Sequence, residues 1–399
     1  MIGFTKLLCG DATVSRALKQ ASGGEEREPR LLQFTTANRP LVVWNMTLRC
    51  NLSCVHCYND AGGRGRAGEL TTAEAEALID DLAEMGVPVL LFSGGEPVLR
   101  PDLCHLGAHA NSRGVRPVLS TNGTLLTAQV ARGLAQAGLR YVGVSVDGLG
   151  ETHDRFRSRQ GAFDAAWQGI ACAQQAGLKT GVRFTVTRDN LEDLPGVLEM
   201  AAAKGIDRFC LYHLVYSGRG TELAGRDLSL EERRNLVEWL VEKTEELHSR
   251  NQAMEILTTD NHADGIYLLQ LILRRDPARA AEVKELLRMH GGCSAGKKFA
   301  NIDVDGNVHP CQFWGHQVLG NVRERRFSEI WNDPQTQLLC QLREMSSHLS
   351  GKCRRCCYRD LCGGCRVRAE AVGGGMWKAD PACYLTDKEI SCNESQPRS

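Results

Sequence analysis

From residue 40 to residue 215, the 399-residue sequence alternates between short apolar runs and amphipathic segments. Several of the apolar runs are continuously hydrophobic, which is typical of strands covered on both faces in a parallel sheet. The sequence therefore predicts a parallel α/β fold. Six strands are too few for an eight-stranded barrel, so we expect an incomplete barrel or an open wound sheet. The expected strands are 41–47, 88–93, 116–121, 141–146, 179–187 and 207–215, and the helices between them are 70–86, 101–114, 126–138, 161–177 and 194–205.

The chain divides into four expected parts. A polar N-terminal extension with a short helical pattern occupies residues 1–39, and the strand–helix units occupy 40–228. A helical connector is expected over 229–290, because 229–251 and 274–290 both carry helical periodicity. From 291 to 399 the sequence is rich in cysteine and glycine, with short strands and little helical periodicity, and this predicts a separate small domain.

Charge and hydropathy exclude some classes of partner. The 48 basic residues balance 48 acidic ones, which removes the usual electrostatic case for nucleic acid or an anionic membrane. No apolar run approaches the roughly 20 residues of a membrane span, and the N-terminus lacks the apolar core of a secretory signal. We therefore expect a cytoplasmic protein, in which 17 cysteines indicate metal sites rather than disulfides.

The spacing Cys50-x3-Cys54-x2-Cys57 places three thiols directly after the first expected strand. Structural zinc normally requires four ligands in paired spacings, and no fourth ligand is nearby. A disulfide with one remaining thiol is the other alternative, although cytosolic chains seldom keep disulfides. An iron–sulfur cluster held by three cysteines keeps one iron open for a non-protein ligand, and we favour this interpretation.

These cysteines, in CNLSCVHCY, resemble the signature of radical S-adenosylmethionine (SAM) enzymes. Further motifs of that family, FSGGEP (92–97), STNG (120–123) and SVDG (145–148), follow later expected strands in the same order. The resemblance implies a partial (β/α)6 barrel with a [4Fe-4S] cluster on the three cysteines. It also implies reductive cleavage of SAM to methionine and a 5′-deoxyadenosyl radical, which abstracts hydrogen from an unactivated carbon.

The same resemblance assigns the SAM contacts. The adjacent glycines Gly94 and Gly95 let the backbone approach the ligand, and Glu96 is expected to accept from its ammonium group. Ser145 and Asp147 are expected to contact the ribose or methionine part of SAM. The remaining candidates are Asn122 and Arg157, of which Arg157 would pair with the SAM carboxylate or be a solvated loop charge.

The C-terminal cysteines resemble the SPASM extension of the same superfamily, which holds auxiliary [4Fe-4S] clusters. One spacing departs from the family pattern, because only Gly363 and Gly364 stand where three residues are more usual. An inner set of cysteines lacks the family's usual fourth cysteine just before Cys293. One iron of its cluster is therefore open or is bound by a non-cysteine ligand or a distant ligand, or the cluster is absent. Zinc knuckles are the alternative. The resemblance assigns Cys353, Cys356, Cys362 and Cys383 to an outer cluster and Cys293, Cys311 and Cys365 to an inner one, while Cys357 has no role.

Longer stretches, among them TTDNHADG (258–265) and GNVRERRFSEIW (320–331), resemble radical SAM enzymes of the alternative heme pathway and of heme d1 synthesis. Both groups act on the tetrapyrrole 12,18-didecarboxysiroheme. The resemblance implies a deacetylase that forms Fe-coproporphyrin III, with the heme d1 enzyme, which alters propionates, as the alternative. A peptide maturase is the second alternative, although the 39 residues before the first strand are too few for a leader-binding module.

A tetrapyrrole is a wide apolar plate with peripheral carboxylates, so its site needs apolar walls and a few cationic side chains. We expect substrate contacts from the end of the sixth strand and the residues after it, namely Tyr212, His213, Tyr216 and Arg219. His213 or His262 are also candidates for an axial ligand to the substrate iron. The expected redox partner is an electron donor such as flavodoxin or ferredoxin, and an auxiliary cluster is an expected electron route.

We predict that protein purified without oxygen carries at least two four-iron clusters, one of which binds SAM. Iron and sulfide analysis combined with EPR spectroscopy measures both properties. Stoichiometric zinc with little iron in a native preparation would contradict the iron–sulfur interpretation of the cysteines.

Overall fold

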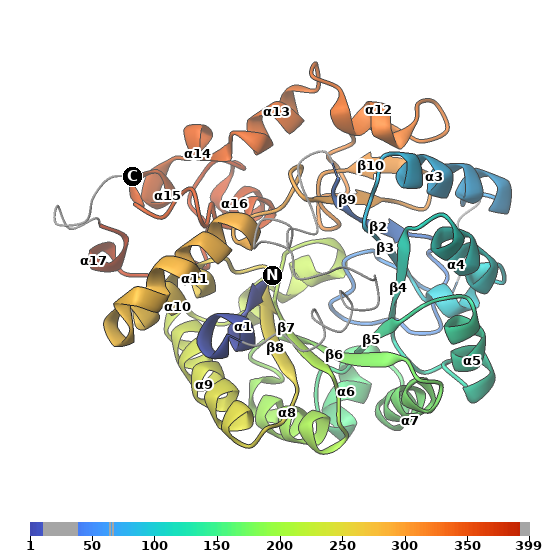
Figure 1. Ribbon diagram of the computed structural model, residues 1–399, viewed down its shortest axis with the longest axis horizontal. Coiled ribbons are helices and arrows are strands. Elements are labelled where there is room, and N and C mark those ends of the chain that lie inside the picture. Colours follow the sequence, from blue (N-terminus) through green and yellow to red (C-terminus); the bar gives the residue numbers. More distant parts are fainter. Residues whose placement is uncertain (11–38, 64, 66–67, 392–399) are drawn as a thin grey trace.

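The computed structural model describes residues 1–10, 39–63, 65 and 68–391. One eleven-stranded sheet forms its centre, in the order β1-β8-β7-β6-β5-β4-β3-β2-β9-β10-β11. Figure 1 shows the strands curving into an arc with the helices on the outer side. Because β1 and β11 end the sheet without pairing to each other, the incomplete barrel is confirmed. The strands are β1 Ile2–Gly3, β2 Leu41–Asn45, β3 Val89–Ser93, β4 Arg116–Thr121, β5 Tyr141–Ser145, β6 Lys179–Val186, β7 Arg208–His213, β8 Glu255–Thr259, β9 Phe299–Ile302, β10 Asn307–His309 and β11 Gly320–Asn321.

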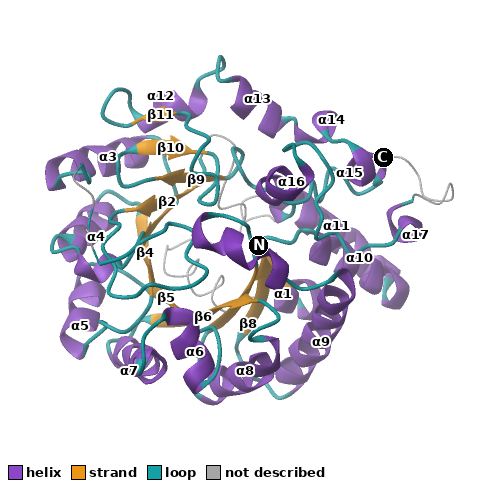
Figure 2. Ribbon diagram, turned by 180° about the vertical axis from the view of Figure 1, so that it is seen from behind, coloured by secondary structure: helices purple, strands orange, loops and turns teal. Residues whose placement is uncertain are grey.

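Strands β2 to β8 pair in parallel, each with the next in sequence. The connecting helices cover the outer face of the arc, and the C-terminal helices gather on one side of it (Figures 1 and 2). The helices are α1 Phe4–Cys9, α3 Thr72–Glu84, α4 Leu103–Ser112, α5 Ala128–Gln136, α6 Gly150–Arg157, α7 Ala162–Gln175, α8 Leu194–Ala203, α9 Leu230–Ser249, α10 Ala263–Arg275, α11 Pro277–His290, α12 Phe327–Asn332, α13 Gln337–Arg343, α14 Met345–His348, α15 Gly351–Arg355, α16 Arg366–Gly373 and α17 Asp387–Ile390.

The two faces of the sheet carry different side chains. On β6 and β7 most of the outward residues are apolar, and Phe184 and Phe209 stack between the sheet and the helices with ring centroids 6.4 Å apart. The alternate residues Arg183 and Tyr212 face the interior of the arc and interact with each other. Apolar packing therefore holds the barrel from outside, while the inner face is free to carry polar groups.

Two strands fall outside the expected set. Strand β8 lies in the segment 229–290, where we expected only helices, and it continues the parallel series beside β7. Its sequence, EILTT, is buried along its whole length. Strand β1 pairs antiparallel with β8 through Ile2 and Gly3, within the expected N-terminal extension. Most of that extension, residues 11–38, lies outside the described residues.

The C-terminal region is joined to the barrel through the sheet itself. Strand β9 pairs in parallel with β2, and β10 and β11 add antiparallel strands beyond it. Short helices, α12 to α17, make up much of the rest, where the sequence showed little helical periodicity. Segments of four to eight residues are too short to display a helical repeat. Among the described residues, no helix combines the length and apolar character needed to cross a membrane.

Gly169 of α7 allows this helix to pack against the loop after β4. A Cβ atom at this position would lie 2.2 Å from the carbonyl oxygen of Gly123. We expect Gly169→Ala to lower the free energy of unfolding by about 1–3 kcal/mol, because overpacking outweighs the higher helix propensity of alanine. Chemical denaturation measures the change. Gly225→Ala, with nothing within 4 Å of the added Cβ, is the control, and equal stability of both variants would contradict the close packing.

Candidate active site

The loop after β2 carries the first three cysteines and is closed by backbone hydrogen bonds. The amide of Cys50 donates to the carbonyl of Gly62 at 2.7 Å, and the amide of Gly62 donates back to Leu48. Glu69 fixes the start of the loop, because its Oε1 accepts from the Leu48 amide at 3.0 Å. Cys50 and Cys54 are buried, and Cys57 is half-buried. The loop therefore presents three thiols from a fixed backbone at the carboxyl end of β2.

The chemistry of these thiols fits an iron–sulfur cluster. Burial, together with the neighbouring cysteines, raises the pKa of Cys50 to about 11, so the free thiol is protonated at neutral pH. Iron can stabilise the thiolate that the protein alone does not. Nitrogen donors already face the sulfur atoms: the Leu52 amide lies 3.4 Å from Cys50 Sγ, and Arg157 Nη1 lies 3.5 Å from Cys54 Sγ. Such donors stabilise negative charge on cluster sulfur.

Gly94 and Gly95 bring the loop after β3 against the cysteine loop. The Gly95 amide donates to the Thr47 carbonyl at 2.6 Å. A Cβ atom on Gly94 would lie 2.5 Å from that carbonyl oxygen, and one on Gly95 would lie 2.3 Å from the Arg49 carbonyl oxygen. Any side chain at either position would separate the two loops. Both glycines therefore allow close approach of the backbone to the cysteine loop, whereas the predicted approach to SAM stays a prediction.

Glu96 differs from the expectation that it is a free acceptor for the SAM ammonium. Its side chain is completely buried, and burial raises its pKa. Its oxygens accept hydrogen bonds from the Thr121 hydroxyl at 2.7 Å and from the Asn122 amide at 2.8 Å. A third bond comes from the amide of Val98. Glu96 therefore ties the loop after β3 to the end of β4, and acts on the site through the backbone that it positions.

Asn122, at the end of β4, is directed at the cysteine loop. Its Nδ2 donates to Asn51 Oδ1 at 2.9 Å and lies 3.9 Å from Cys50 Sγ. Its Oδ1 accepts from the Thr124 amide, which fixes the orientation of the side chain. Ser145 is half-buried at the end of β5, opposite Arg183 in the strand register. Both residues lie at the carboxyl ends of parallel strands, where α/β proteins place their ligands.

Asp147 holds Arg157 rather than presenting a free carboxylate. The two form an ion pair that is buried on both sides. The Asp147 oxygens also accept from the Thr185 amide at 2.7 Å and lie 3.3 Å from His56 Nε2. Burial alone would raise the pKa of Asp147, but Arg157 and His56 hold it below its ordinary value. Arg157, the last residue of α6, is thus a buried cation beside Cys54 and not a solvated loop charge.

The outer auxiliary cysteines lie around one cavity. Cys353, Cys356, Cys362 and Cys383 all line it, together with Gly363 and Gly364. Burial and then Cys383 raise the pKa of Cys362 well above its ordinary value. Both glycines have positive φ angles, 69° and 62°, so this short connection to Cys365 requires a backbone conformation that favours glycine. The departure from the family spacing is therefore a tight Gly-Gly turn.

The inner cysteines come from three separate segments. Burial raises the pKa of Cys311, and Cys293 and Cys365 raise it further, because their charges act at short range. The amide of Cys293 donates to the carbonyl of Cys362 at 3.1 Å, which links the inner set to the outer one. Both sets therefore lie in the C-terminal region as the resemblance implies. Cys357 donates its amide to the carbonyl of Ile390.

The expected substrate residues separate into two groups. Tyr212 faces the interior of the barrel, whereas His213 points outward and is completely buried between helices. His213 Nε2 lies 3.0 Å from Asp264, and Nδ1 lies 3.0 Å from Arg233, so the ring is not available as an iron ligand. The alternation of a strand explains the difference, since neighbouring residues face opposite sides. His262 is buried near Arg368 and Asp380, and burial lowers its pKa to about 3.

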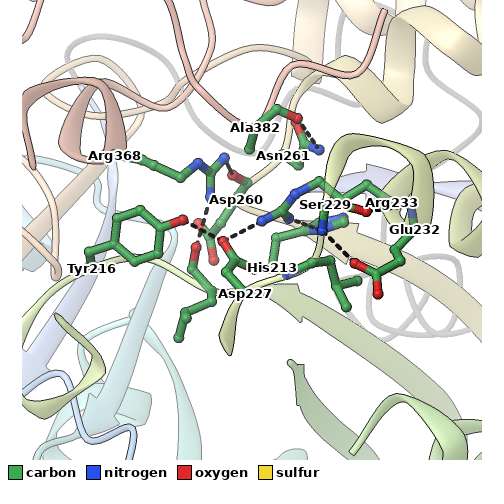
Figure 3. A network of polar contacts seen from close by, with 12 residues as sticks. His213, Tyr216, Asp227, Ser229, Glu232, Arg233, Asp260, Asn261, Arg368 and Ala382 are labelled. Carbon is green, nitrogen blue, oxygen red and sulfur yellow. Dashed lines mark hydrogen bonds and ion pairs between the residues drawn. The ribbon is translucent and has the colours of Figure 1, made fainter. Parts of the chain in front are cut away.

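Tyr216 and Arg219 have structural partners. The Tyr216 hydroxyl donates to Asp227 at 2.6 Å, in the polar network that Figure 3 shows around Arg233 and Arg368. Arg219 donates through Nε to the carbonyl of Cys54 at 2.8 Å and thereby supports the cysteine loop. Neither side chain is free for a substrate carboxylate in this arrangement.

Interior polar residues of the barrel were missed by the sequence interpretation. Arg183 donates to the Ser120 hydroxyl, and a Cβ atom on Gly143 would lie 2.4 Å from its Nε. A Cβ atom on Gly181 would lie 1.9 Å from the Tyr141 hydroxyl. The two glycines therefore make room for these side chains. The signal was present in KTGVRFTV, where small and polar residues alternate with Val and Phe.

Comparisons with known proteins agree with this geometry. The Radical SAM superfamily model matches residues 44–201, and the model of the SPASM iron-sulfur cluster-binding domain matches 293–357. Fe-coproporphyrin III synthase of Methanosarcina barkeri is 49% identical over 99% of this chain and 100% of its own length. Pre-heme d1 synthase of Dinoroseobacter shibae is 39% identical over 90% of this chain and 89% of its own.

A solved structure resembles the fold. Streptococcus suis SuiB bound to S-adenosylmethionine has a TM-score of 0.68, covering 92% of this chain and 86% of its own, at 18% identity. At this identity the likeness concerns the fold alone. It extends over both the partial barrel and the C-terminal region.

His153 predicts a measurable pH dependence of stability. Its ring accepts from the Asp147 amide at 3.0 Å, and burial, followed by Arg157, lowers its pKa to about 3. The unfolded chain binds a proton near pH 6.5 that the folded chain does not, so this stability is present above pH 6.5 and is lost as pH falls toward 3. We expect His153→Gln, which keeps an acceptor, to reduce the slope of unfolding free energy against pH between 6.5 and 5. Denaturation at several pH values measures it, and an unchanged slope would contradict the assignment.

Proposed function

The chain belongs to the radical SAM superfamily, and from this premise we propose that it removes the two acetate side chains of 12,18-didecarboxysiroheme to form Fe-coproporphyrin III. The observation that carries the proposal is the 49% identity to Fe-coproporphyrin III synthase over the full length of that relative. The SPASM region and the position of the cysteine loop at the carboxyl ends of the strands support it. Pre-heme d1 synthase, at 39% identity, makes the heme d1 reaction the second candidate.

The residues at the SAM site have different proposed roles. Cys50, Cys54 and Cys57 would hold the [4Fe-4S] cluster, which together with SAM supplies the 5′-deoxyadenosyl radical when both are bound. The backbone of Gly94 and Gly95 lies against the cysteine loop, and the absence of side chains there would let the methionine part of SAM approach. Three further residues hold parts of the site in place. Glu96 fixes the glycine loop, Asn122 fixes the cysteine loop and Asp147 orients Arg157.

The barrel interior suits a substrate that carries carboxylates. Arg183 lies inside the arc, donates to Ser120 and is surrounded by Tyr212, Tyr141 and Tyr58. Within the described residues, no carboxylate forms an ion pair with Arg183. A guanidinium group in this position gains charge-assisted hydrogen bonds when an anionic group of a ligand reaches it. We propose that Arg183 binds a propionate or acetate of the tetrapyrrole, beside the aromatic ring of Tyr212.

The proposed reaction on each acetate-bearing ring begins at the saturated carbon that bears a hydrogen atom. Removal of this hydrogen atom leaves a radical next to the carbon that carries the acetate arm. Cleavage of the carbon–carbon bond to the arm forms a ring double bond and releases the arm as a carboxymethyl radical. One electron and one proton convert this fragment to acetate, and a reduced flavodoxin or ferredoxin is the proposed source of the electron. Two such cycles extend the conjugation of the macrocycle, which favours the product.

The proposal predicts loss of both acetate arms when the protein is incubated without oxygen with didecarboxysiroheme, SAM and a reductant. Mass spectrometry identifies the product. Retention of both acetates with altered propionates would favour the heme d1 reaction, whereas modification of a peptide alone would exclude a tetrapyrrole substrate. The triple variant Cys50→Ala, Cys54→Ala and Cys57→Ala should form no 5′-deoxyadenosine and serves as the control for radical chemistry.

A second variant tests the substrate contact. We expect Arg183→Gln to weaken tetrapyrrole binding roughly tenfold to a hundredfold, the loss of one charge-assisted hydrogen bond, while SAM binding is retained. Arg140→Gln, at an exposed position before β5, is the matched control. Titration of the tetrapyrrole absorbance with each protein measures the affinity. Equal affinities of the two variants would contradict the role of Arg183.

A further inference from the structure

A cavity of about 200 Å³ lies between the cysteine loop and the segment that carries the inner auxiliary cysteines. The cysteine loop contributes Tyr58 and Asn59, which directly follow Cys57. From the C-terminal region comes Gln312, which directly follows Cys311. The cavity therefore lies close to the place where the radical is generated.

Two amide side chains of the cavity project from the inner face of the sheet. Asn45 follows Trp44 of β2, and Asn301 precedes Ile302 of β9, where Trp44 and Ile302 pack in the outer core. Because neighbouring residues of a strand face opposite sides, both amides face the interior of the arc. Asn45 Nδ2 donates to Asn301 Oδ1 at 3.2 Å, and the Tyr58 hydroxyl donates to Asn45 Oδ1 at 3.0 Å. The cavity thus belongs to the barrel interior.

Three side chains that line the cavity carry donors without a partner among the described residues. Asn59 Nδ2 is buried and unpaired, while Oδ1 of the same amide accepts from Asn45 Nδ2 at 3.1 Å, which fixes its orientation. Gln312 and Ser217 are half-buried, and their side chains make no hydrogen bond to the described part of the chain. A buried donor without an acceptor is unfavourable, so these groups favour a ligand that supplies acceptor oxygen atoms.

The two acids that line the cavity have partners of their own. Asp60 forms an ion pair with Arg219, with 2.5 Å between Oδ1 and Nη1. Asp303 accepts from the amide of Asn307 at 2.8 Å through Oδ1, and its Oδ2 lies 3.1 Å from His309 Nε2. The groups of the cavity that remain for a ligand are therefore uncharged donors.

We propose that this cavity binds the acetate arm of the reacting tetrapyrrole ring, with Asn59 and Gln312 as donors to its carboxylate. The proposal rests on the deacetylase reaction proposed above, and it leaves a propionate for Arg183. The location fits, because the arm departs from the carbon next to the site of hydrogen abstraction and has to lie near the cysteine loop. The chemistry fits as well, because uncharged donors bind a carboxylate without an ion pair, so the released acetate dissociates more easily than from arginine.

The test compares binding of the substrate with binding of Fe-coproporphyrin III, which lacks both acetate arms and keeps the propionates. In Gln312→Glu a carboxylate replaces the donor amide, so we expect the affinity for didecarboxysiroheme to fall roughly tenfold to a hundredfold. The affinity for Fe-coproporphyrin III should stay unchanged. Asn59→Asp, which keeps the shape of the side chain, should have the same effect. Titration of the tetrapyrrole absorbance without oxygen measures both affinities.

Gln136→Glu, the same change at an exposed position of α5, is the matched control and should alter neither affinity. Iron content and SAM binding are measured for each variant, which separates loss of a cluster from loss of the arm contact. Equal weakening of substrate and product binding, or normal substrate affinity in both variants, would overturn the proposal. If Gln312→Glu does not fold, Asn59→Asp decides alone.

The unchanged protein separates this inference from the function on which it rests. If it leaves both acetates on the tetrapyrrole during turnover, the deacetylase function is wrong and the arm contact is wrong with it. If it removes the acetates while both variants bind the substrate normally, only the arm contact is wrong.

Discussion

The buried ion pair between Arg368 and Asp380 connects the two halves of this molecule. Both residues are almost completely shielded from solvent, and Arg368 extends from α16 to the carbonyl groups that end β7 and β8. Asp380 transmits the contact to the backbone of Cys365. Removing one member of such a pair leaves an uncompensated charge, at a cost of about 3–5 kcal/mol. The position of the auxiliary cysteines over the barrel therefore depends on this pair.

A second buried carboxylate organises the SAM side of the barrel. Glu96 joins the ends of β3 and β4, and the glycines before it allow the loop to touch the cysteine loop. The Asp147–Arg157 pair does the same for β5 and α6. In each case a charged side chain that the sequence assigns to the ligand is used within the protein, where it positions a neighbour. These contacts within the protein hold the loops of the site in place.

The sequence predicted strands β2 to β7 and the location of the motifs at their carboxyl ends, because apolar periodicity and short spacings are local properties. It did not distinguish the two sides of a strand for His213, whose outward direction follows from the register of β7 with its neighbours. It missed β8, since five residues between two helices give a weak signal. Glu96 accepts from Thr121 and Asn122, which are distant from it in the chain, so only the assembled structure identifies its role.

The parallel pairing of β2 with β9 has a consequence for electron transfer. Strand β2 leads directly into the SAM-site cysteines, and β9 follows the first auxiliary cysteine by a few residues. Backbone hydrogen bonds between adjacent strands thus connect the two redox regions, with no hinge in the pairing. The rate of electron tunnelling falls steeply with distance, and this connection fixes the distance between the two redox regions, so domain motion does not set the rate of transfer between them. The timing of electron transfer must then depend on the difference in reduction potential and on whether the SAM site is occupied.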